Sequence, residues 1–209
     1  MNVSQAVQGI GGLVALAVIV VAIGVAVTAG WYLVRLGTAP GIVVHEAAHV
    51  LACRLVGVPV YDVKFFGFGV PAGYVRHGEP ARYRRLFAIS VAPFVVNTVA
   101  AFAAFSWLAV LVKTGDVRAS SGMLVMAIVS GWLGLSVGMQ AFPSTGDARA
   151  LWDRSRSEWR RSPVVLLGLP VIVVIYVANL LSWVWADVCY ALGLGIAAFA
   201  LVGVQLPLL

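Results

Sequence analysis

The chain has 209 residues, of which 62% are hydrophobic and only 11% are charged. A soluble domain of this length covers its surface with many more charged side chains, so the composition excludes an ordinary soluble protein. The formal net charge is +6, but the basic residues lie between apolar runs, as they do in membrane proteins, and we expect no nucleic-acid partner.

Six apolar segments follow one another along the chain, most of them close to the length of about 20 residues that spans a bilayer. The first is too long for the core of a signal peptide, and we expect it to be retained. The sequence therefore predicts an all-α, polytopic membrane protein with a single domain over residues 1–209. The predicted helices cover residues 9–34, 38–56, 85–112, 121–141, 163–184 and 188–208.

The connection at 57–84 has the composition of β-strands. Its valines and aromatic residues favour strands, and Gly67, Pro71 and Gly73 favour turns among them. We expect one or two short β-hairpins over residues 57–78, near the cytoplasmic membrane surface. A strand edge at about 58–75 could bind an extended substrate as an added strand; alternatively, the hairpin only covers this face of the protein.

Basic residues orient the predicted helices. Eleven of the fourteen Lys and Arg residues lie in, or directly beside, the connections at 57–84 and 142–162. Two helices separate these connections, so both lie on the same side of the membrane. The positive charge places them, and both termini, in the cytoplasm of a multi-pass cell-membrane protein. Arg82, Arg84 and Arg85, and the arginines between 149 and 161, are expected to meet anionic lipid headgroups.

The second apolar segment contains the motif that carries the chemistry, His45-Glu46-Ala47-Ala48-His49. In a helix, the two histidines lie one turn apart on the same face, so both can bind one Zn²⁺ ion. Glu46 is then close enough to a zinc-activated water to act as general base. Coincidence, or a histidine pair satisfied by neighbouring helices, is the alternative. It is a poor one, because ionisable groups inside an apolar span usually mark function.

A catalytic zinc site needs a third protein ligand, and Asp147 is the best-placed carboxylate. It follows the fourth segment on the cytoplasmic side, towards which His49 leads its helix. The alternative role of Asp147 is to cap a helix. Gly131, Gly134 and Gly138 would let the fourth helix approach the second closely, or would serve general packing. The remaining carboxylates lie in loops, in the strand region or on the opposite side: Asp62, Glu79, Asp116, Asp153, Glu158 and Asp187.

Together, these features resemble the site-2 protease family of intramembrane zinc metalloproteases. The resemblance includes the H-E-x-x-H motif, the strand-rich connection after it, Pro93 and Asn97 in the third segment, and Pro143 followed by Asp147. It implies a compact, six-helix metalloendopeptidase of the prokaryotic type, which cleaves membrane proteins in or near their transmembrane segments (regulated intramembrane proteolysis). It also implies that Asp147 is the third zinc ligand and that Asn97 holds the substrate backbone or steadies the tetrahedral intermediate.

Within this resemblance, Asn97, Pro93 and Gln140 are the predicted substrate-binding residues. Gln140 lies near the position where the family commonly has an asparagine, and it either replaces its hydrogen bonds or caps a helix. Asn97 could instead tie helices together, because a buried amide needs hydrogen-bond partners. Pro93 is expected to kink its helix and to free a backbone carbonyl. Asp147 departs from the family pattern, because Ala148 follows it where the family usually has glycine.

Two other functions are compatible with a buried H-E-x-x-H motif: a zinc-binding membrane transporter and an inactive pseudoprotease. A transporter normally has several polar sites along a path, or related halves, whereas this sequence has one concentrated site and no internal repeat. An inactive protein has no need of Glu46, because that residue is not required for metal binding. The sequence therefore favours the enzyme.

Overall fold

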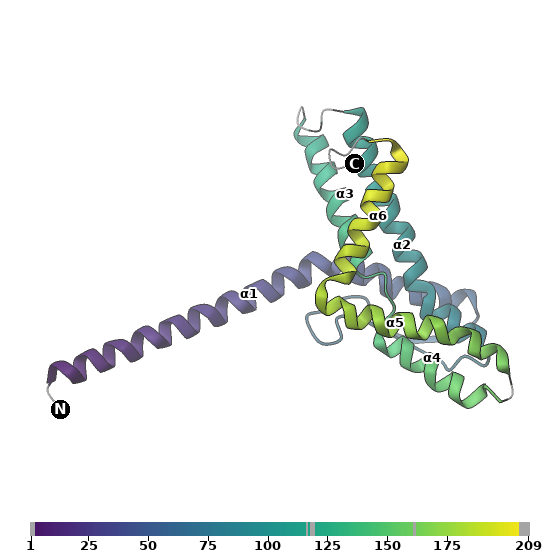
Figure 1. The fold of residues 1–209 in the computed structure, drawn as a ribbon, viewed down its shortest axis with the longest axis horizontal. Helices are drawn as coiled ribbons and strands as arrows, with labels where there is room; N and C mark the ends of the chain where they lie inside the picture. Colours follow the sequence, from purple (N-terminus) through teal and green to yellow (C-terminus); the bar gives the residue numbers. More distant parts are fainter. Residues whose placement is uncertain (1–2, 116, 118–119, 161, 205–209) are drawn as a thin grey trace. The chain divides into compact units, whose positions relative to one another are not determined.

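The computed structural model of this protein describes residues 3–115, 117, 120–160 and 162–204. Contacts between residues divide the chain into two units, Met1–Gly37 and Thr38–Leu209. Most of the described chain is helical, as the composition and the apolar segments predict (Figure 1).

The first unit is formed by the first part of α1, which runs from Val3 to Leu55. Its stretch Ala15–Gly37 is long and apolar enough to cross a membrane. The apolar segments predicted a connection at residues 35–37, but the backbone is helical there and stays helical through Pro40. A proline removes one backbone hydrogen bond from a helix, and helices of membrane proteins tolerate this loss where neighbouring groups compensate for it.

The described part of the second unit contains the end of α1, a β-hairpin and five further α-helices. Helices α2, α3 and α6 pack against one another, and α4 packs against α5 (Figure 1). Two 3₁₀ turns flank α5. In chain order, the elements after α1 are β1 (Val60–Lys64), β2 (Tyr74–His77), α2 (Tyr83–Thr114), α3 (Ser121–Met139), α4 (Thr145–Glu158), η1 (Pro163–Gly168), α5 (Leu169–Leu181), η2 (Ser182–Val184) and α6 (Ala186–Val202).

The predicted β-hairpin at 57–78 is confirmed. Strands β1 and β2 pair antiparallel, with Val63 opposite Val75 and Lys64 opposite Tyr74. Between the strands, the chain makes the turn that the glycines and Pro71 predicted.

The connection at 142–162 is not the irregular loop that its polar composition suggested. Helix α4 occupies most of it and buries one narrow face, formed by Ala148, Leu151 and Ser155. Only a few apolar positions mark this face, so the arginine-rich surface hides the helical pattern in the sequence.

Four helical stretches of the described residues are long and apolar enough to cross a membrane: Ala15–Gly37, Tyr83–Thr114, Ser121–Met139 and Val165–Val184. Helix α6 is also apolar but has only 17 residues, and residues 38–55 form no separate span by these criteria. The structure therefore indicates a helical membrane protein, in which four of the six predicted spans have the length and composition that a bilayer requires.

The glycines of α3 pack against different helices from the one the sequence suggested. A β-carbon on Gly134 would lie 2.8 Å from the ring of Phe105 in α2, and one on Gly138 would lie 2.8 Å from Ala191 in α6. The glycine face therefore joins α3 to α2 and α6. The close approach to α1 is made instead by Gly41, whose backbone N–H donates to Oγ of Ser136 at 3.0 Å.

Candidate metal centre

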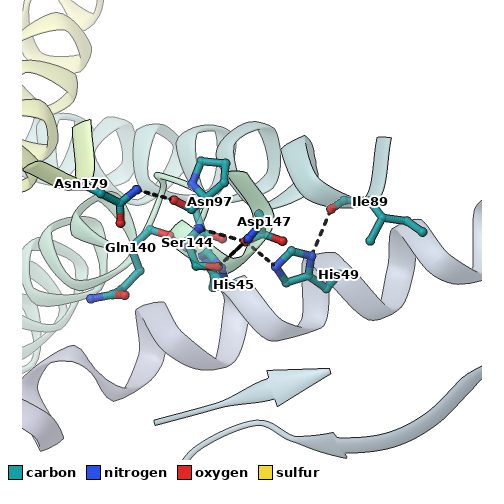
Figure 2. Close-up of polar contacts among 9 residues, drawn as sticks. His45, His49, Ile89, Asn97, Gln140, Ser144, Asp147 and Asn179 are labelled. Carbon is teal, nitrogen blue, oxygen red and sulfur yellow. Dashed lines mark hydrogen bonds and ion pairs between the residues drawn. The ribbon is translucent and has the colours of Figure 1, made fainter. Parts of the chain in front are cut away.

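Three potential metal ligands converge from two distant parts of the chain. His45 and His49 extend from α1, and Asp147 extends towards them from the first turn of α4 (Figure 2). One ligand atom from each residue lies within 4.8 Å of the other two, and Oδ2 of Asp147 lies 3.7 Å from Nε2 of His49. Ligand atoms on a tetrahedral zinc are about 3.3 Å apart, so the cluster needs only a small contraction to hold the ion.

Both histidine rings are oriented by backbone carbonyls. Nδ1 of His45 lies 2.8 Å from the carbonyl oxygen of Gln140, and Nδ1 of His49 lies 3.0 Å from that of Ile89. A carbonyl oxygen can only accept a hydrogen bond, so each Nδ1 carries the proton. Each Nε2 is therefore left with the lone pair that a metal ion requires, which is the usual arrangement of histidine ligands.

Pro93 explains why the carbonyl of Ile89 is available to His49. In a regular helix, the carbonyl of residue 89 accepts a hydrogen bond from the N–H of residue 93, but proline has no N–H. Pro93 is buried within α2, and the carbonyl that it leaves free accepts the ring N–H of His49. The sequence predicted a freed carbonyl, and the structure shows which side chain uses it.

Asn97 lies at the junction of three helices and is completely buried. Its Nδ2 atom lies 3.2 Å from the carbonyl oxygen of Gly41, 3.2 Å from that of Val137 and 3.0 Å from that of Gln140. It thus joins α1 and α2 to the end of α3. The carbonyl of Gln140 also accepts from His45, so Asn97 and the candidate ligand His45 share one hydrogen-bond acceptor.

Gln140 contributes to the site through its backbone. It forms the C-terminal cap of α3, as one of the two sequence-based alternatives proposed, and its carbonyl orients His45. The predicted substrate-binding roles of Asn97, Pro93 and Gln140 stay predictions. What the structure shows is that all three residues support the histidines.

Asp147 serves both as a helix cap and as a candidate ligand. Its Oδ2 atom accepts hydrogen bonds from the backbone N–H of Ser144 at 2.8 Å and from the Ser144 hydroxyl at 2.6 Å. In return, Oγ of Ser144 accepts from the N–H of Asp147 at 3.1 Å. This capping box fixes the carboxylate at the start of α4. The two roles that the sequence offered as alternatives therefore coexist.

The segment before α4 is held from α5. Nδ2 of Asn179 donates to the carbonyl oxygen of Pro143 at 2.8 Å (Figure 2). It also donates to the carbonyl oxygen of Ile175 in its own helix at 2.8 Å. Pro143 itself is buried. Anchoring at Pro143 places Ser144, and with it the capped Asp147, opposite the two histidines.

Glu46, the predicted general base, is a residue of α1, and its side chain lies against the β-hairpin. It is only 9% exposed. The backbone of Gly73, just before β2, packs against it: a β-carbon on Gly73 would lie 2.7 Å from Cγ and 2.9 Å from Oε1 of Glu46. The glycine therefore permits the hairpin to cover the base.

The hairpin is fastened across its two strands by a side-chain contact. The hydroxyl of Tyr74 donates to Oδ2 of Asp62 at 2.8 Å, and this bond is the main reason that the pKa of Tyr74 is raised. Asp62 is thus engaged within the sheet, away from the metal cluster, as its exclusion from the ligand set predicted.

Several supporting residues were not predicted from the sequence. Ser144 has a local signal, because a serine three residues before an acidic residue is a capping-box pattern. Ile89 and Gly73 have none that identifies their partners. Each of them acts on a residue far away in the sequence, through contacts that only tertiary packing creates.

Comparison with known proteins supports a zinc-dependent peptidase. Residues 38–138 match the model of the DUF3267 family, whose description is "Putative zincin peptidase". This range includes His45, Glu46 and His49, as well as the supporting residues Ile89 and Asn97, and ends before Asp147. The chain matches no curated protein and no solved structure.

Proposed function

We propose that this protein is an intramembrane zinc metalloendopeptidase, which hydrolyses peptide bonds in or near the transmembrane segments of other membrane proteins. The convergence of Asp147 with His45 and His49 carries the proposal. Two imidazoles and one carboxylate are a common ligand set of catalytic zinc, and they leave the fourth position open. The match to a family of zinc peptidases and the apolar helices support the same conclusion.

The residues around the ligands suit peptide hydrolysis. A bound zinc ion would activate water and polarise the scissile carbonyl. Glu46 would accept a proton from the attacking water and donate it to the departing amine. Its enclosure by α1 and Gly73 limits bulk water around the carboxylate. The carbonyls of Ile89 and Gln140 keep both imidazoles in place during these proton transfers.

The hairpin is the proposed substrate-binding element. A peptide bond in a helix is a poor substrate because its backbone groups are already hydrogen-bonded, so cleavage requires an extended segment. Each strand of the two-stranded sheet has one partner in the described sheet, and an extended peptide could add to an outer edge. The contact between Gly73 and Glu46 would bring such a peptide close to the general base.

The proposed location is a cell membrane, crossed six times, with both termini and the connections at 57–84 and 142–162 in the cytoplasm. Residues 38–55 and α6 would supply the two further spans, in addition to the four that length and composition identify. Six crossings require the chain to reverse direction between the first two spans, whereas the backbone of α1 is helical at 35–37. The side of the membrane on which the N-terminus lies is therefore the critical point. Labelling of a cysteine introduced at Ser4 by an impermeant reagent, in sealed vesicles of known orientation, tests it.

A Glu46→Gln variant tests the proposed activity. Glutamine preserves the size of the side chain but cannot take up the proton, so we expect full zinc content and at least a hundredfold lower cleavage of a membrane-protein substrate. Glu79→Gln is the matched control, because Glu79 is an exposed residue paired with Arg154. Substrates can be captured with the inactive variant in native membranes. Unchanged cleavage by Glu46→Gln would exclude this mechanism, and a metal-free, chelator-insensitive wild type would exclude the zinc enzyme.

A further inference from the structure

A basic hollow lies between the end of α1 and the start of α2, outside the metal centre. It has a volume of about 370 Å³ and is lined by Leu55, Val56, Arg82, Arg84 and Arg85. The three arginines thus surround a space that also has an apolar wall. The side chain of Leu55 is 77% exposed on that wall.

The charges of these arginines are not balanced within the described part of the protein. No ion pair there joins Arg82, Arg84 or Arg85 to a carboxylate. The nearby acidic residues have another partner: Arg154 lies 2.9 Å from Glu79 and 2.7 Å from Glu158. An unbalanced cluster of three guanidinium groups favours an anionic ligand, and guanidinium groups bind phosphate oxygens in pairs.

A second hollow shows why the first one is the better anion site. It has a volume of about 460 Å³ and shares Arg82 and Arg84, but Glu158 also lines it. A carboxylate on the wall opposes the binding of an anion. The hollow beside Leu55 has no acidic residue on its wall.

The position of the hollow identifies the source of the anion. The apolar stretch of α2 that can cross a membrane begins at Tyr83, so Arg82, Arg84 and Arg85 lie where that helix meets the membrane surface. Arginines at such a position bind the headgroups of anionic lipids. The exposed Leu55 would contact the first carbons of an acyl chain, which a free phosphate ion lacks.

We propose that this hollow binds one anionic phospholipid, with the phosphate between Arg82, Arg84 and Arg85 and the acyl chains beside Leu55. The site goes beyond the proposed function and does not depend on it. It is connected to the metal centre through α4, because Arg154 also donates to the carbonyl oxygen of Ala81, directly before the cluster, at 3.2 Å.

Binding is tested with the purified protein in a neutral detergent. Native mass spectrometry and thermal unfolding are compared for phosphatidylglycerol, for phosphatidylcholine with the same acyl chains, and for inorganic phosphate. We expect one tightly bound phosphatidylglycerol. The Arg82→Gln/Arg84→Gln double variant should bind it roughly 25-fold more weakly, at about fivefold per arginine. Arg149→Gln/Arg156→Gln is the matched control, because it removes the same charge from exposed positions of α4.

Three outcomes would overturn the proposal. Equal weakening by both double variants would show diffuse attraction to the net charge, and equal binding of the two lipids would show that the headgroup is not recognised. Equal stabilisation by inorganic phosphate would show a phosphate site without lipid contacts. Leu55→Ser adds a test that leaves the charges intact. It should weaken the binding of phosphatidylglycerol and leave any binding of inorganic phosphate unchanged. Glu46→Gln should bind the lipid as the wild type does, so the site can be tested even if the protein is not a peptidase.

Discussion

Nδ1 of His49 donates a hydrogen bond to the carbonyl oxygen of Ile89 at 3.0 Å. This carbonyl has no helical N–H to accept, because the residue four positions later is Pro93. A proline in α2 thus frees the carbonyl that orients His49, a candidate metal ligand in α1. The pairing gives Pro93 a defined effect on metal binding, separate from any effect on the shape of its helix.

Replacement of Pro93 by alanine should weaken zinc binding without destabilising the fold. The new N–H at residue 93 would compete with His49 for the Ile89 carbonyl, and loss of such support typically lowers metal affinity 10- to 100-fold. Alanine also favours helix by about 3 kcal/mol over proline, so the metal-free protein should unfold at the same temperature or higher. Zinc titration and thermal unfolding measure the two effects. Pro40→Ala, inside α1, is the control, and an unchanged zinc affinity in Pro93→Ala would contradict the assigned role.

A side chain at residue 73 should disable the general base. In Gly73→Val, the new atoms would collide with Glu46, whose Cγ would lie 2.7 Å from an added β-carbon. We expect a large loss of cleavage with unchanged zinc content, since the three ligands are not touched. Gly69→Ala is the matched control in the same turn, because its β-carbon would meet no atom closer than 3.9 Å. Full activity in Gly73→Val would show that the hairpin moves away from Glu46 before catalysis.

The two roles of Asp147 can be separated by substitution. Asp147→Asn keeps an oxygen that can accept from Ser144, but it loses the negative charge, so zinc affinity should fall by at least tenfold while stability changes little. Ser144→Ala should do the reverse: it removes the cap, at about 1 kcal/mol of stability, and retains the ligand. Zinc content and thermal unfolding of the metal-free proteins provide the comparison. Asp153→Asn, exposed on the same helix, should leave both properties unchanged; full zinc affinity in Asp147→Asn would refute the ligand assignment.

Asn97 should behave as a positioning residue. Its amide bonds to three backbone carbonyls, and one of them orients His45. Asn97→Ala should therefore cost about 1–3 kcal/mol of stability, because buried acceptors lose their donor, and it should also weaken zinc binding. Thr98→Val is the control in the same helix, because the Thr98 hydroxyl hydrogen-bonds to the hydroxyl of Tyr190 in α6 and not to the carbonyls that Asn97 joins. A variant with normal stability and zinc affinity but a raised KM would instead support the substrate-binding role that the family resemblance implies.

The residues predicted from the sequence are those whose relationship is local. His45 and His49 lie one helical turn apart, so their spacing alone determines that they share a face of the helix. Glu46 follows from the same local motif. Asp147 could be predicted from the topology, because the order of the apolar segments places it on the side of the membrane towards which His49 leads its helix. The hairpin followed from strand-forming residues punctuated by glycine.

The supporting contacts could not be predicted in this way. Pro93 predicts that the carbonyl of Ile89 has no helical partner. Only the packing of α2 against α1 determines that the ring of His49 donates to this carbonyl. The contact between Gly73 and Glu46 depends on how the hairpin packs. The apolar pattern also misled at residues 35–37, where the backbone stays helical although hydropathy falls.

Both imidazoles donate hydrogen bonds to main-chain carbonyl oxygens, those of Gln140 and Ile89. Every amino acid carries such an oxygen, so relatives are free to change the side chains at these two positions without losing the orientation of the ligands. Changes of side chain at 89 and 140 would thus leave no sign, in a comparison of sequences, that these positions support the candidate metal centre. Residue 93 has no such freedom, and a proline there would be the one visible trace of the arrangement.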